Sequence, residues 1–119
     1  MYTTIESLTL DGRNRSLAYK STGFHVANGS WDGQIFDQIA PHGNEIILTK
    51  TSSSVFISTN INYVLSNLCV KQLVSSGLVT DQCIESASRD ACNLGYLVTR
   101  VRDACLSYSQ ARYDRSLDV

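Results

Sequence analysis

A cysteine at the start of a helix is the residue of this sequence best placed for chemistry. Cys83 follows an apolar run that ends in GLV at 77–79, and apolar residues recur after it at helical spacing: Ile84, Ala87, Ala91 and Leu94. Thr80 or Asp81 is predicted to cap this helix. The unpaired N–H groups and the positive dipole end of a first turn favour a thiolate. Such a thiolate attacks carbonyl carbon, and the same N–H groups can bind the developing oxyanion.

Lys50 is the second candidate, because it ends the predicted strand EIILTK at 45–50. An ammonium next to Cys83 would further stabilise the thiolate, although a lysine at a strand end is most simply a solvated residue. The candidates for a proton acceptor are His25 and His42, which both lie in loop-like segments where histidines are usually solvated. The residues alone leave open whether Cys83 is catalytic or a buried structural cysteine.

The other cysteines give no sign of a metal or disulfide framework. Cys69, Cys83, Cys92 and Cys105 are separated by 14, 9 and 13 positions, which matches no zinc or iron–sulfur spacing. Cys69 and Cys92 fall among apolar helix positions, where a cysteine usually serves as a small core residue. We therefore expect both of them to be buried.

The length and charge balance of the chain indicate which kinds of partner to expect. The chain has 119 residues, enough for one domain, with 10 basic and 11 acidic side chains. This balance gives no electrostatic reason to expect nucleic acid or an anionic membrane as partner. The sequence has no long apolar run, and its first residues, MYTTIESLTL, do not resemble a signal peptide. We expect a cytoplasmic protein with a small-molecule substrate or a protein partner.

The order of elements predicts an α/β fold. Strands are predicted over 1–7, 45–50, 71–79 and 96–101, and helices over 31–39, from Thr59 or Asn60 to Leu68, from Cys83 to Leu94 and over 107–117. Residues 8–31 are predicted to form a long loop, and Asp103 a turn or cap. Alternating strands and helices favour a parallel sheet between helical layers, with ligands at the carboxyl ends of the strands. Lys50 and Cys83 both fall at that edge.

Four segments together resemble the isochorismatase-like cysteine hydrolases, a superfamily that includes nicotinamidases and carbamoylases. They are LTKTSSSVF (48–56), TNINYVLSNL (59–68), GLVTDQCIESASRDACNLGYLVT (77–99) and DACLSYSQARYDRSL (103–117). The resemblance covers nearly the whole chain and implies a three-layer, Rossmann-like parallel sheet without a cofactor. It also implies a catalytic lysine at Lys50, a nucleophile at Cys83 and a cis peptide at Leu78-Val79. That peptide would direct the N–H groups of Val79 and Cys83 onto the oxyanion.

The sequence departs from the family pattern in three ways. The family's catalytic aspartate lies in a DMQ-like motif on its first strand, and the sequence has no such segment. Its last strand has no counterpart either, so the resemblance implies a single partial domain over 1–119, truncated at both ends. Without the central first strand, the remaining strands would be left as two pairs. Metal-binding relatives carry Asp-x-His where this chain reads Ile5-Glu6-Ser7, so no metal is expected.

The resemblance implies a hydrolase that cleaves an amide or related C–N bond through a Cys83 thioester. The missing aspartate implies impaired activity, because general acid–base catalysis typically supplies about 100- to 10,000-fold. The alternative is a non-catalytic paralogue that forms homo-oligomers, or hetero-oligomers with full-length paralogues, through its helices and strand edges.

Overall fold

The computed structural model describes residues 1–117, which fall into two compact units, Met1–Thr59 and a second unit from Asn60 onward. The first unit contains β1 (Tyr2–Ile5), α1 (Leu17–Thr22), the 3₁₀ turns Trp31–Gly33 and Asp37–Ile39, β2 (Ile47–Lys50) and α2 (Val55–Ser58). The second contains α3 (Ile61–Asn67), β3 (Gln72–Leu78), a π turn (Thr80–Ile84), α4 (Glu85–Asn93), β4 (Leu97–Leu106) and α5 (Gln110–Leu117). No helix within residues 1–117 is long and apolar enough to cross a membrane.

Each unit has its own two-stranded parallel sheet. β1 pairs with β2, which brings Ile5 opposite Lys50, and β3 pairs with β4 from Gln72 opposite Leu97 to Leu78 opposite Leu106. Parallel strands need crossover connections, and helices supply these in each unit. The predicted α/β class, with parallel strands and flanking helices, is confirmed.

The predicted long loop over 8–31 contains α1, so that prediction was wrong in part. Ser16 caps α1 by accepting a hydrogen bond from the Tyr19 N–H at 3.3 Å, and Gly23 ends it with φ of 72°. The Tyr19 ring is buried and packs on Phe24, with ring centroids 5.0 Å apart. A serine cap and a glycine stop with six residues between them are helix signals in the sequence. A helix of six residues has fewer than two turns, too short for a clear periodic apolar pattern.

The predicted helix over 31–39 is two separate 3₁₀ turns, because Gln34 between them has extended backbone angles. Gly33 weakens helix propagation at that point. β4 is longer than predicted and runs on to Leu106. Asp103 is therefore a strand residue, not a turn or cap.

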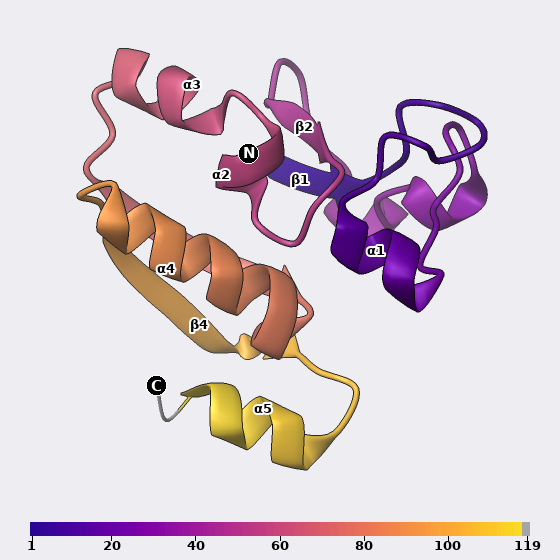
Figure 1. Ribbon diagram of the computed structural model, residues 1–119. Helices are drawn as coiled ribbons and strands as arrows, with labels where there is room; N and C mark the ends of the chain where they lie inside the picture. The colour runs from indigo at the N-terminus through magenta and orange to yellow at the C-terminus, as the bar shows by residue number, and fades with distance from the viewer. Residues whose placement is uncertain (118–119) are drawn as a thin grey trace. The chain divides into compact units, whose positions relative to one another are not determined.

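Within the described residues of the second unit, helix α4 covers one face of the sheet. Figure 1 shows α4 lying along β4, and Ala91 of α4 is buried. Successive strand side chains point to opposite faces, and one face of this sheet leaves large apolar side chains more than half exposed: Val74 75%, Leu78 61%, Leu97 62% and Leu106 62%. This apolar surface comes from the sheet of a single unit.

We expect Gly77→Ala to destabilise the second unit by about 1–2 kcal/mol, because Gly77 has φ of 129°, where a side chain strains the backbone. An added Cβ would lie 3.6 Å from Ile84 Cδ1, which is ordinary contact. The cost therefore comes from the backbone, and urea unfolding measures it. The control is Ser76→Ala at the neighbouring exposed position. A Gly77→Ala variant as stable as Ser76→Ala would contradict the prediction.

Candidate active site

The turn between β3 and α4 carries Cys83. β3 ends at Leu78, the Leu78-Val79 peptide bond is cis, and the π turn Thr80–Ile84 leads directly into α4. The Val79 carbonyl accepts hydrogen bonds from the Gln82 N–H at 3.1 Å and the Ile84 N–H at 3.2 Å. The second bond spans five residues, the π pattern that is frequent at functional sites. Cys83 thus lies in the first helical turn after a parallel strand.

The predicted cap of this helix was wrong. Val79 is the N-cap residue, and no side chain caps the turn. Thr80 and Asp81 lie inside the turn because the π pattern starts three residues before Cys83. Thr80 is fully buried, and within residues 1–117 its Oγ1 has no hydrogen-bond partner. Cys83 itself is 6% exposed, so it is a buried residue.

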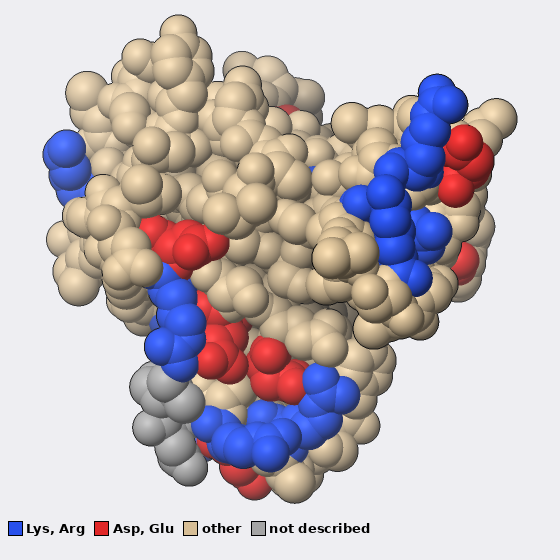
Figure 2. Space-filling view, viewed as in Figure 1, with Lys and Arg blue, Asp and Glu red and all other residues tan. Residues whose placement is uncertain are grey.

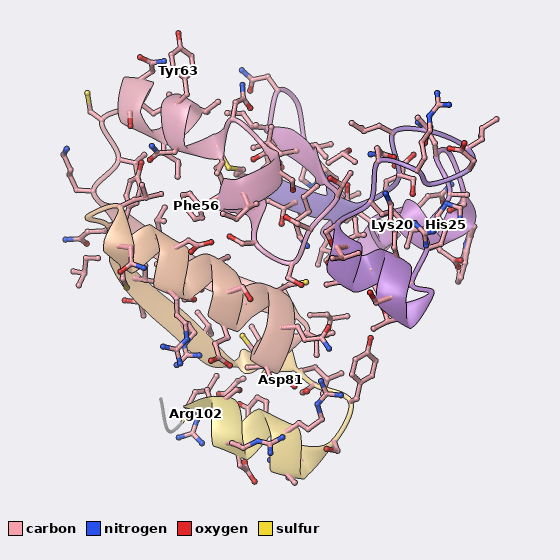
Figure 3. The ribbon with its side chains drawn as sticks, viewed as in Figure 1. Lys20, His25, Phe56, Tyr63, Asp81 and Arg102 are labelled. Carbon is pink, nitrogen blue, oxygen red and sulfur yellow. The ribbon has the colours of Figure 1, made fainter. Side chains whose placement is uncertain are left out.

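The Asp81 carboxylate forms hydrogen bonds and an ion pair with residues far away in the sequence. Its Oδ2 accepts from Arg112 Nε at 2.6 Å and lies 2.6 Å from Arg112 Nη2, and its Oδ1 accepts from the Ser107 hydroxyl. Figure 3 shows Asp81 at the end of α4 that is near α5. Burial works against the charged form, but the hydrogen bonds from Ser107 and Arg112 outweigh it. The pKa of the Asp81 carboxyl is therefore lowered from its usual value.

Lys50 is the last residue of β2 and is 4% exposed. Its Nζ donates a hydrogen bond to the Ser52 carbonyl at 2.9 Å. The alternative of a solvated lysine at a strand end is therefore wrong. Burying an ammonium group is costly unless its donors are satisfied, and lysines are rarely buried to this extent. An uncommon, buried cation at the carboxyl end of a parallel strand is the feature of the first unit that suggests chemistry.

The remaining candidates are less suited to catalysis. His25 and His42 are exposed, as expected for loop histidines. Cys69 and Cys92 are also exposed, so the prediction that they are core residues was wrong. Cys69 lies just past the end of α3 with φ of 56°, and Cys92 lies on the outer side of the last turn of α4. Apolar neighbours in the sequence did not fix the face on which these cysteines lie.

Comparison with known proteins places the chain in a family. A family model described as an isochorismatase domain matches residues 2–119. The chain belongs to the isochorismatase family. The chain is 38% identical over 79 residues to a ureidoacrylate amidohydrolase of Agrobacterium fabrum, an alignment that covers 66% of this chain and 35% of that protein. It spans about a third of the length of the curated relatives that it matches.

Solved structures share the fold of this isochorismatase family member. A cysteine hydrolase from Pseudomonas syringae matches with a TM-score of 0.89 at 23% identity, over 98% of this chain and 61% of that one. N-carbamoylsarcosine amidase from Thermoplasma acidophilum matches with a TM-score of 0.82 at 24% identity, over 99% of this chain and 66% of that one.

The sequence of this isochorismatase family member gave no indication of the ion pair at Asp81. Ser107 and Arg112 lie 26 and 31 residues further along the chain, so no local spacing connects them to the Cys83 turn. From the sequence alone Asp81 is predicted to be a helix cap, the usual role of an aspartate just before a helix. Only the parallel pairing of β3 with β4 brings the segment after β4 next to the segment after β3.

Proposed function

We propose that this chain carries a cysteine-hydrolase site for an amide or related C–N bond, with Cys83 as the nucleophile. The observation that carries the proposal is the place of Cys83, a nearly buried thiol in the first helical turn after the parallel strand β3. A helix start supplies N–H groups and a positive dipole end that favour thiolate and oxyanion alike. The curated relative named as a ureidoacrylate amidohydrolase supports an amide-like substrate.

In the proposed reaction, the Cys83 thiolate attacks the carbonyl carbon and forms a tetrahedral oxyanion. The backbone N–H groups of Val79 and Cys83 are proposed to donate hydrogen bonds to this oxygen. When the oxyanion collapses, the C–N bond breaks, the amine takes up a proton and leaves, and a thioester remains on Cys83. Water then attacks the thioester, releases the carboxylic acid and restores the thiol.

Lys50 is proposed as the catalytic cation of this reaction, and its burial supports that assignment. No step is assigned to a metal or cofactor. A leaving amine needs a proton, and the sequence has no DMQ-like segment to supply an acid. We therefore propose that these 119 residues alone cleave amides slowly but can still be acylated at Cys83. The single family match across both units supports the expectation of one domain, which stays a prediction.

A non-catalytic binding partner is the second candidate. The observation in its favour is the exposed apolar face of the β3–β4 sheet, since large exposed apolar surfaces commonly mark protein interaction sites. On this proposal, a second copy or a full-length paralogue covers that face, and Cys83 is no longer used for chemistry.

Two acyl donors with different leaving groups test the catalytic proposal. The leaving group of p-nitrophenyl acetate departs as an anion and needs no proton, so we expect a burst of nitrophenolate with one acetyl group on Cys83 by mass spectrometry. Ureidoacrylate is expected to release ammonia slowly. A folded protein that shows no burst and no acetyl group on Cys83 would overturn the hydrolase proposal, and a stable oligomer in the same sample would favour the binding partner.

A further inference from the structure

We propose that Arg112 is a positioning residue that keeps the Cys83 thiol reactive by holding and neutralising the carboxylate of Asp81 in the same turn. The proposal deepens the proposed function, because it concerns the turn of the proposed nucleophile. Three elements meet at this ion pair: Asp81 lies in the turn after β3, Ser107 directly follows β4, and Arg112 lies in the first turn of α5.

The ion pair between Asp81 and Arg112 is partly buried, unlike a typical exposed ion pair. Both carboxylate oxygens of Asp81 are engaged, one by Ser107 and the other by two nitrogens of Arg112. The Asp81 side chain is only 13% exposed, and that of Arg112 is 35% exposed. Hydrogen bonds between charged groups are roughly twice as strong as neutral ones, and partial burial limits screening by salt.

A neighbouring ring holds the guanidinium in place. The Arg112 Cζ atom lies 5.2 Å from the centroid of the Tyr108 ring, within the range of a cation–π contact. The Arg112 backbone N–H is bonded to the Ser109 hydroxyl at 3.3 Å, which fixes the start of α5. Figure 2 shows acidic and basic side chains interspersed over α4 and α5. Arg89 and Glu85 are another pair there, but both belong to α4, four residues apart, so this pair joins no second element.

The charge of Asp81 gives Arg112 a second effect. Asp81 is two residues before Cys83 in the same π turn, and an uncompensated carboxylate there would disfavour a thiolate. The guanidinium cancels this charge. Loss of Arg112 therefore has two consequences of opposite sign for an alkylating reagent. A looser turn exposes the Cys83 thiol and speeds alkylation, whereas an uncompensated carboxylate lowers the thiolate fraction and slows it.

The test measures alkylation of each cysteine by iodoacetamide at pH 7, with peptide mass spectrometry as the readout. Arg112→Gln is expected to slow alkylation of Cys83 by about three- to tenfold, the size of effect that one nearby charge has in partly buried surroundings. Asp81→Asn combined with Arg112→Gln is expected to restore the rate, because no charge is then left to compensate. Arg112→Lys keeps a cation and should stay near the parent rate. The exposed Cys69 and Cys92 are internal controls whose rates should not change.

A purely structural role for Arg112 predicts a different pattern. In that case Arg112→Gln and the double variant would both speed Cys83 alkylation, and this result would overturn the proposal, as would unchanged rates. If Arg112→Gln does not fold, Asp81→Asn is compared with the double variant. Asp81→Asn leaves the guanidinium as an uncompensated cation, so faster alkylation of Cys83 in Asp81→Asn than in the double variant supports the proposal. Equal rates, or a faster double variant, contradict it. Because no substrate is used, the result is independent of whether the chain hydrolyses amides.

Discussion

Cys83→Ala is expected to lower acyl transfer from p-nitrophenyl acetate and ammonia release from ureidoacrylate by at least about a thousandfold, because no covalent intermediate can then form. Alanine fits the space of the buried thiol, so the variant should fold. The expected thermal melt is close to that of the parent, since only one sulfur atom is removed from a site that is 6% exposed. A retained burst in this variant would show that another group reacts.

The matched control is Cys105→Ala, which removes a thiol that is 9% exposed and therefore similarly buried. Cys105 lies in β4, opposite Gly77 of β3, and is therefore a strand residue and not part of a helical turn. We expect this variant to keep the burst and the acetyl group on Cys83. If both alanine variants lose activity equally, the loss reflects weakened packing of the second unit and not the chemistry of Cys83.

The strands and the turn were predictable because they rest on local signals. Apolar runs of limited length ending in glycine or polar residues fixed β2 and β3, and helical spacing after Cys83 fixed α4. The resemblance implied two remaining strand pairs, and the described strands pair in that way. The start of the helix could not be predicted within three residues, because a π turn and an α turn use the same residue types.

Side-chain burial was harder to predict than the elements. Lys50 is predicted at a strand end, but its burial and its hydrogen bond to the Ser52 carbonyl depend on how the chain folds around it. Cys92 is exposed because of the side of α4 on which it lies, and Cys69 is exposed because it lies past the end of α3. The Asp81–Arg112 pair depends on the β3–β4 crossover. These three features all depend on tertiary contacts, which cannot be deduced from local patterns in a single sequence.

Lys50→Met is expected to separate function from stability. Methionine has nearly the length of lysine without its charge, so the substitution removes the cost of burying an ammonium group. We expect the free energy of unfolding of the first unit to change by no more than about 1 kcal/mol in either direction, because the lost hydrogen bond to Ser52 offsets part of the gain. Urea unfolding measures this change.

The same substitution is expected to slow acylation of Cys83 by about 100- to 10,000-fold if Lys50 supplies the charge or proton of the reaction. The control is Lys20→Met, which removes an exposed lysine from α1 and should leave the rate unchanged (Figure 3).

Alkylation of Cys83 in Lys50→Met adds a second readout. A slower alkylation would mean that the ammonium stabilises the thiolate, and an unchanged alkylation with slow acylation would mean that it acts after attack. A Lys50→Met variant with the parent acylation rate would contradict the assignment of Lys50, and the burial of this lysine would then need a structural explanation.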